Sequence, residues 1–115
     1  MNQTPEAVSV VCDANGFRVT FRPVGEPEEE VQGLWSNIVL VAAYKKNYFA
    51  FEVVCVRLQM SSGKKVEVSE SDEGFSEFAT RLTQRIPDVD KNWLHRLMER
   101  PADGTVQTLF RKGWL

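Results

Sequence analysis

The hydrophobic pattern of this 115-residue chain changes its period once, near residue 70. Before that point apolar and polar residues alternate in short runs, as they do in half-buried β-strands. After it, the apolar residues Phe75, Phe78, Ala79, Leu82 and Ile86 recur at the spacing of one face of an α-helix. Strands that precede the helices, rather than alternate with them, favour an α+β fold over a parallel α/β fold.

Five strand-like runs precede the change of period: residues 8–12, 17–22, 39–45, 48–60 and 65–69. The first two flank Asp13-Ala14-Asn15-Gly16, and Asn-Gly between alternating runs is the strongest short-range hairpin signal. Residues 45–47 and 61–64 are expected to be turns, and such short connections favour antiparallel neighbours. Residues 23–30 hold two prolines, a glycine and four glutamates, and this composition predicts a solvated loop.

The helical stripe predicts a first helix that begins near Phe75 and ends before Pro87, with Ser71 or Asp72 as its cap. A second helix is expected over residues 90–100, and the tail at 105–114 alternates weakly and is expected to return as an edge strand. The sequence therefore predicts a curved antiparallel sheet of five to six strands followed by two C-terminal helices. We expect one domain over residues 1–115, disordered at 1–6 and 113–115.

Composition excludes several classes of protein. Hydrophobic residues make up 43% and charged residues 26% of the chain, as in ordinary globular domains. The net charge of −2 argues against a nucleic-acid-binding protein, which needs a basic excess. The N-terminus resembles no secretory signal, and the longest apolar run, 38–44, is too short to cross a membrane. We expect a soluble cytoplasmic protein, in which Cys12 and Cys55 are small buried residues rather than a disulfide.

No catalytic, cofactor or metal motif is visible in the sequence. His95 is the only histidine, and its place off the apolar stripe of the second helix predicts a solvent-facing side chain. Glu52 is the exception among the acids, because it interrupts the apolar face of the longest strand. It is expected either at an open sheet end or as a buried group inside a pocket. That pocket would be lined by the residues Tyr44, Phe49, Phe51 and Glu52.

Acidic residues gather in two segments, around 26–30 and around 67–77. If the segments are adjacent in the fold, they form a negative surface that attracts a basic partner. The candidate interaction residues are Glu28, Glu29, Glu30, Glu70, Asp72 and Glu73. The alternative interpretation is that these are ordinary solubilising charges.

A series of motifs over residues 34–101 resembles a group of small uncharacterised bacterial proteins. They are Trp35-x-x-Ile38, Ala43-Tyr44-Lys45, Val66-x-Val68-x-Glu70 and Gly74-Phe75-x-x-Phe78. The order of strands before an amphipathic helix is also similar to pleckstrin-homology and GRAM-type domains. The resemblance implies a binding module and assigns no functional residue.

We therefore expect a non-enzymatic domain that needs no cofactor and recognises a protein through its acidic surface. An immunity-type inhibitor of a basic toxin is one version of this function. The alternative is a small-ligand-binding protein or an enzyme with its pocket near Glu52. A third expectation is a homodimer formed through an edge strand.

Overall fold

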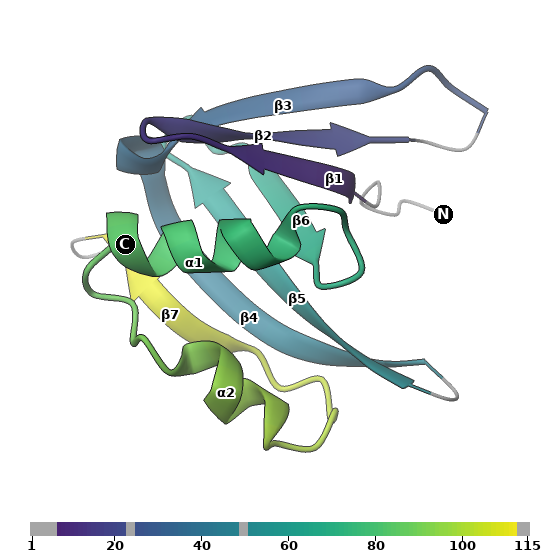
Figure 1. The fold of residues 1–115 in the computed structure, drawn as a ribbon, viewed down its shortest axis with the longest axis vertical. Coiled ribbons are helices and arrows are strands. Elements are labelled where there is room, and N and C mark those ends of the chain that lie inside the picture. The colour runs from purple at the N-terminus through teal and green to yellow at the C-terminus, as the bar shows by residue number, and fades with distance from the viewer. Residues whose placement is uncertain (1–6, 23–24, 49–50, 113–115) are drawn as a thin grey trace.

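The computed structural model describes residues 7–22, 25–48 and 51–112. In this part of the chain, seven strands form two antiparallel sheets, and two α-helices and one short 3₁₀ helix complete the fold (Figure 1). The three-stranded sheet has the order β1 (Ala7–Cys12), β2 (Gly16–Phe21), β3 (Glu29–Leu34). The four-stranded sheet has the order β6 (Lys65–Ser69), β5 (Phe51–Met60), β4 (Ile38–Tyr48), β7 (Gln107–Arg111). The prediction of an α+β fold is confirmed, but the single sheet of five to six strands is wrong.

The β1–β2 hairpin forms where the Asn-Gly signal predicts it. The side chain of Asp13 closes the turn, because its Oδ1 accepts hydrogen bonds from the backbone N–H groups of Asn15 and Gly16 at 2.7 and 2.8 Å. Phe17, Val19 and Phe21 are buried, as their alternation predicts. The hairpin therefore follows from local sequence alone.

Strand β3 was missed because its sequence is polar. Residues 29–34 pair antiparallel with β2, although 23–30 were predicted to be a loop. Glycine at position 33 permits the pairing, since a Cβ atom there would lie 2.7 Å from the ring of Phe17. An edge strand needs only one partner and no apolar face of its own, so alternation is a weak guide to it.

Strands β4 and β5 form the longest pair, from Ile38↔Met60 to Tyr48↔Phe51. The predicted turn at 45–47 is wrong, because these residues continue β4. The core positions of β5 are as predicted: Val54, Val56, Leu58 and Met60 are all buried. The 3₁₀ helix Trp35–Asn37 precedes β4.

Helix α1 (Phe75–Arg85) buries the predicted apolar stripe against the sheets. The predicted side-chain cap is wrong: Gly74 precedes the helix at φ +87°, and no side chain caps it. Helix α2 (Trp93–Met98) is shorter than predicted, and Met98 is half exposed. Strand β7 then returns antiparallel to β4, as the weak alternation of the tail indicates.

The return of β7 separates this fold from the pleckstrin-homology layout. Those domains end on a closing helix, whereas here both helices lie between β6 and β7. The fold therefore does not match a pleckstrin-homology-like layout, and the strand expected from the tail is present as β7.

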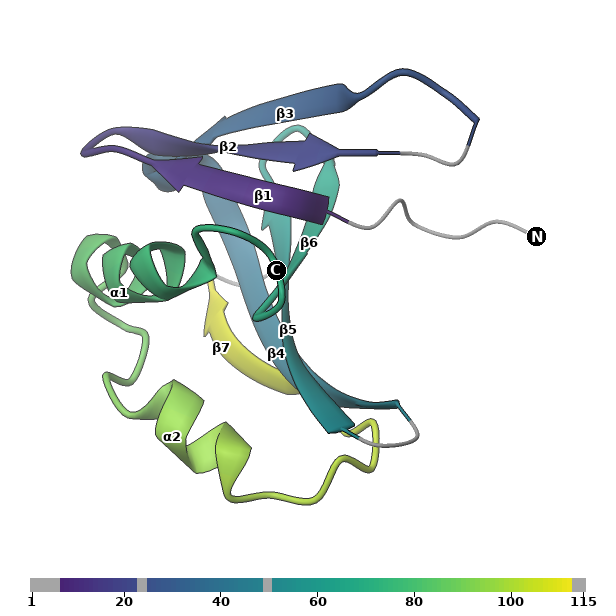
Figure 2. The ribbon, with the colours of Figure 1, turned by 45° about the vertical axis from the view of Figure 1, so that its right-hand side comes forward.

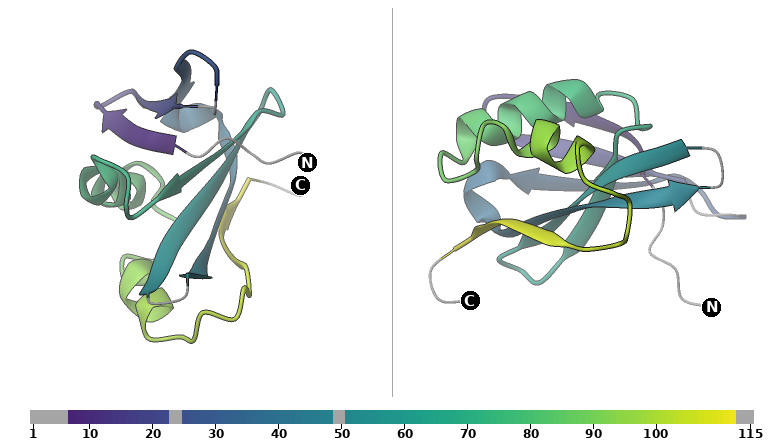
Figure 3. Two further views of the ribbon diagram at one scale, coloured as in Figure 1. Left: turned by 90° about the vertical axis from the view of Figure 1, so that its right-hand side faces the viewer. Right: turned by 90° about the horizontal axis from the view of Figure 1, so that it is seen from below.

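Both helices lie on one side of the four-stranded sheet (Figures 2 and 3). The main core fills the space between this side, the three-stranded sheet and α1. No helix of the described residues covers the opposite side, which we call the outer face (Figure 3). The register assigns it alternate residues of each strand. They are Leu40, Ala42, Tyr44, Lys46, Phe51, Val53, Cys55, Arg57, Gln59, Lys65, Glu67, Ser69, Thr108 and Arg111.

In the described ranges, neither helix is long and apolar enough to cross a membrane. The expected disorder at 1–6 and 113–115 lies outside the described residues.

Candidate functional site

The predicted acidic residues of the first segment lie on the free edge of the three-stranded sheet. Glu28, Glu29 and Glu30 are exposed, the last two on β3. Two arginines partly neutralise them: Arg22, which follows β2, pairs with Glu28, and Arg18 on β2 lies 3.7 Å from Glu30. Surface pairs of this kind contribute little stability, so the glutamates remain accessible to another charged group.

The acidic residues of the second segment have structural roles in the loop between β6 and α1. Glu70 Oε1 accepts a hydrogen bond from the backbone N–H of Val54, and Asp72 Oδ2 accepts one from Ser69, both at 2.8 Å. The backbone of Glu73 pairs with β1. The carboxylates of Glu70 and Asp72 therefore close the loop, whatever else they contact, and the backbone of Glu73 joins it to β1.

The two acidic segments do not form one continuous group. The loop that holds Glu73 lies against β1, whereas Glu29 and Glu30 lie on β3, and β2 runs between those two strands (Figure 1). Glu70 and Asp72 instead contribute to a cavity of about 540 Å³ between α1 and α2, which also includes Thr80, Lys91 and other residues.

The residues of the predicted pocket are distributed over both sides of the four-stranded sheet. Phe49 lies outside the described residues. Tyr44 is buried on the outer face, whereas Glu52 lies on the helix side, where it is exposed and pairs with Lys45 at 2.9 Å. Phe51 is exposed at the end of β5. Tyr44 and Glu52 therefore do not face a common cavity.

Among the described positions, Lys45 is the one charged residue that is buried, with 5% of its surface exposed. Its Nζ contacts Glu52 and donates a hydrogen bond to the backbone carbonyl of Met98 at 3.0 Å. That carbonyl belongs to the last turn of α2, where a cation is favourable. Lys45 therefore attaches α2 to β4 and is not an exposed residue of a turn.

A polar cluster that was not predicted from sequence lies on the outer face. Glu67 of β6 accepts hydrogen bonds from Tyr44 (2.7 Å), Arg57 (2.9 Å) and Lys46 (3.2 Å). The guanidinium of Arg57 also stacks over the ring of Tyr44, with its carbon 4.6 Å from the ring centroid. We call these four residues the Glu67 cluster.

Burial and charge pairing shift the pKa values of the cluster in opposite directions. Burial opposes ionisation of Glu67, but hydrogen bonds from Tyr44 and Arg57 and the charge of Lys46 hold its pKa below the ordinary value. Burial, followed by the hydrogen bond to Glu67, raises the pKa of Tyr44 to about 12. Burial lowers the pKa of Lys46, but the carboxylate more than offsets this effect, so its pKa is raised. Each group is therefore fixed in its ordinary protonation state near neutral pH.

A cavity of about 310 Å³ adjoins this cluster on the outer face. Arg57, Lys65 and Glu67 contribute polar groups to its wall, and Leu40 and Ala42 contribute apolar ones. Val106, just before β7, and Thr108, within β7, also line it. The cavity thus combines apolar surface with basic side chains.

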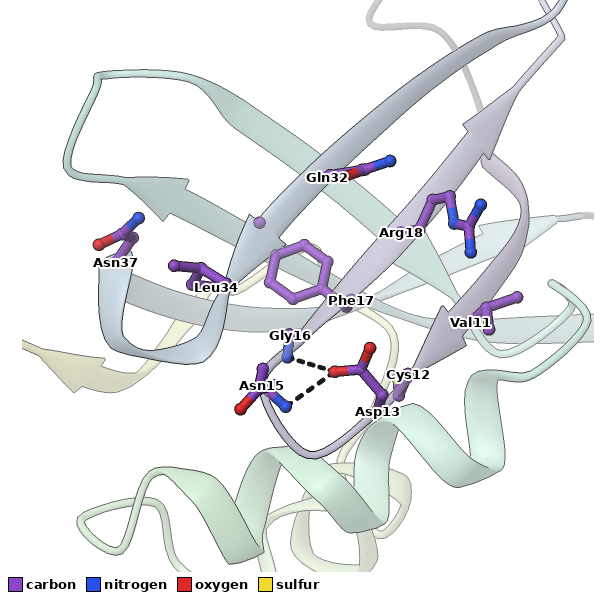
Figure 4. A pocket seen from close by; sticks show the side chains of 11 residues that line it. Val11, Cys12, Asp13, Asn15, Gly16, Phe17, Arg18, Gln32, Leu34 and Asn37 are labelled. Atoms are coloured by element: carbon purple, nitrogen blue, oxygen red, sulfur yellow. Dashed lines mark hydrogen bonds between the residues drawn. The ribbon is translucent and has the colours of Figure 1, made fainter.

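A third cavity, of about 400 Å³, lies at the tip of the β1–β2 hairpin (Figure 4). Its polar lining includes Asp13, Arg18 and Gln32, and its apolar lining includes the exposed side chains of Val11 and Leu34. Backbone hydrogen bonds from Gly16 and Asn15 lower the pKa of Asp13. Because these bonds close the turn, the carboxylate of Asp13 serves the hairpin itself.

The remaining reactive side chains are not brought together. His95 is exposed and pairs with Glu99 one turn along α2, at 3.0 Å, as the sequence predicts for a solvent-facing histidine. Cys12 and Cys55 are free thiols on different sheets, and burial raises the pKa of each to about 11. Within the described part of the chain, no group of three or more histidine, cysteine, aspartate or glutamate residues could hold a metal ion.

Comparison with protein-family models, with curated proteins and with solved structures found no match for this chain.

Proposed function

We propose that this chain is a non-enzymatic binding domain that recognises a basic segment of a protein partner along strand β3. The observation that carries the proposal is the free edge of that strand. β3 is the last strand of its sheet, and within the described residues the backbone of Glu29–Leu34 forms hydrogen bonds only with β2. An extended segment can add to such an edge through backbone hydrogen bonds.

The glutamates at the start of β3 favour a basic occupant. An arriving strand that carried lysine or arginine would meet Glu28, Glu29 and Glu30, all exposed. Edge charges also discourage pairing with neutral strands, so the same residues would select the partner. A second copy of this chain would bring further glutamates to the edge, and like charges across strands are destabilising. An inhibitor of the immunity type, directed at a basic toxin, would use the edge in this way.

The acidic residues near α1 are a weaker basis for the interaction. The carboxylates of Glu70 and Asp72 hold backbone N–H groups, so changing them would alter the loop as well as the charge. The test should therefore change the β3 edge alone.

The experiment is affinity capture from lysate of the native host with three proteins: the wild type, the edge variant and a control. The edge variant carries Glu28→Gln, Glu29→Gln and Glu30→Gln. The control removes the same charge elsewhere with Glu77→Gln, Asp88→Asn and Glu99→Gln, all exposed. We expect the wild type and the control to retain one basic protein in stoichiometric amount, and the edge variant to retain at least about tenfold less.

Hydrogen exchange then distinguishes strand addition from surface attraction. In the complex, amides of β3 that exchange rapidly in the free domain should become protected, because they gain backbone partners. Equal capture by all three proteins, or unchanged exchange in β3, would refute the role of this edge. An empty capture would refute the protein partner and leave the small-ligand function expected from sequence.

A further inference from the structure

The outer face carries a charge opposite to that of the whole chain. Among the described residues that the register places there, Lys46, Arg57, Lys65 and Arg111 are basic and Glu67 alone is acidic. The chain as a whole has a net charge of −2. The other acidic residues lie mainly on other surfaces, so Glu67 offsets only part of the positive charge of this face.

Within this face, the charge of Glu67 is already satisfied. Arg57 and Lys46 both contact its carboxylate, and Tyr44 donates a further hydrogen bond to it. One carboxylate thus faces two cations, of which Arg57 lines the cavity, and Lys65 adds a second cation to the cavity wall. Lys65 is exposed, and the side chain of Arg57 is 55% exposed. A negative group that enters the cavity would meet an excess of positive charge.

The cavity also has an apolar part. Leu40, Ala42 and Val106 contribute to its lining, and Val106 is 47% exposed. Gln59 and Thr108 add polar groups. The volume of about 310 Å³ is within the range of small-molecule sites. An exposed apolar side chain beside two cations is suited to a ligand that has both an apolar body and a negative group.

We propose that this cavity binds a small organic anion, with its apolar body over Leu40, Ala42 and Val106 and its negative group at Lys65 and Arg57. The site lies on the four-stranded sheet and shares no residue with the β3 edge. It is therefore independent of the proposed protein interaction, and either function can fail without the other.

The test uses two dyes that differ in one group. 8-Anilinonaphthalene-1-sulfonate has an apolar body and a sulfonate, whereas N-phenyl-1-naphthylamine has the same body without the charge. Each is titrated into the folded 115-residue chain, with fluorescence as the readout, and amide chemical shifts map the binding site. We expect saturable binding of the sulfonate, at least about fivefold tighter than that of the neutral dye and weakened by salt.

Neighbouring lysines provide a matched pair of variants. Lys65 lines the cavity, whereas Lys64 lies in the preceding turn and does not. Lys65→Gln should weaken sulfonate binding about fivefold and leave the neutral dye unchanged, and Lys64→Gln should change neither. Val106→Glu, at an exposed position, should abolish sulfonate binding because it places a carboxylate beside the ligand.

Thermal unfolding of each variant confirms that it is folded before binding is compared. Equal binding of both dyes with no effect of Lys65→Gln would overturn the anion site. The anion site would also be overturned if the sulfonate changed amide shifts only away from the cavity. Failure of the sulfonate to saturate below about 1 mM, which corresponds to negligible affinity, would overturn it too.

Discussion

Gly74 is the position where the structure predicts the largest effect of adding a single methyl group. The residue has φ +87°, a conformation that side-chain-bearing residues rarely adopt. A Cβ atom there would also lie 2.0 Å from the backbone oxygen of Val10 on β1. Gly63, in the turn between β5 and β6, has a similar φ of +91° but has nothing within 4 Å of the same atom. Replacing each glycine by alanine therefore separates backbone strain from steric contact.

The expected cost of Gly63→Ala is the conformational strain alone, about 1–2 kcal/mol. Gly74→Ala carries the same strain and also forces the loop away from β1. The movement breaks two backbone hydrogen bonds, from Val10 N–H to Glu73 O (2.8 Å) and from Glu73 N–H to Val8 O (3.3 Å). At about 0.5–1.5 kcal/mol for each bond, the additional loss is about 1–3 kcal/mol.

Urea unfolding at equilibrium measures the difference between the two variants. With an m-value of about 2 kcal/mol/M, Gly74→Ala should unfold at a urea concentration about 0.5–1.5 M below that of Gly63→Ala. Hydrogen exchange should show lost protection of the Val10 amide in Gly74→Ala alone. If the two variants unfold at the same urea concentration, the close contact between the loop and β1 does not exist, and the reasoning fails.

Three further predictions concern buried polar and reactive groups. Lys45→Met should lower the free energy of unfolding, measured with urea, by about 1–3 kcal/mol, because it leaves the last carbonyl of α2 without its donor. An unchanged free energy of unfolding would refute the role of Lys45 in attaching α2 to β4. The pKa of Glu67 is below its ordinary 4.5 in the folded protein, so its stabilising contribution is present above that pH and is lost as the pH falls through the folded pKa. Glu67→Gln should therefore reduce the loss of stability on acidification. The same change should lower the pKa of Tyr44 from about 12 towards 10 in an absorbance titration, although the burial of Tyr44 remains. An unchanged pKa of Tyr44 and an unchanged acid sensitivity would contradict the hydrogen-bonded pair. The pKa values of Cys12 and Cys55 are raised to about 11. Both thiols should therefore react with a disulfide reagent at pH 8 at least about tenfold more slowly in the folded protein than in the unfolded chain. Equal reaction rates in the two states would show that the fold does not protect them.

Local patterns predicted the elements that bury a regular apolar face. The Asn15-Gly16 turn, the alternation in β5 and the stripe of α1 each encode one element through residues close in sequence. Each side chain in these patterns lies on the predicted side, and Val54, Val56 and Phe78 are all buried in the main core. The exception within α1 is its start, where a glycine in a left-handed conformation replaces the expected side-chain cap.

The candidate sites depended on contacts that no local pattern contains. The Glu67 cluster joins side chains from three strands, and Tyr44 and Glu67 are 23 positions apart. Read in sequence, Glu67 is an ordinary polar residue of an alternating strand. Its role appears only when β5 lies between β4 and β6 and sets Arg57 opposite it. The alternation of β6 places Glu67 on the face away from the core, but it cannot supply the partners found there.

The sequence by itself determined the fold class, the first hairpin, the core faces of the long strand and the first helix, because hydrophobic period and turn chemistry act over a few residues. Only the tertiary structure decided the division into two sheets, the edge strand β3, the attachment of α2 by Lys45 and the basic outer face. These features arise when segments far apart in the chain become neighbours, as Lys45 and Met98 do across 53 positions. The free energy of such contacts depends on burial and on the partner found, and neither is a property of either segment alone.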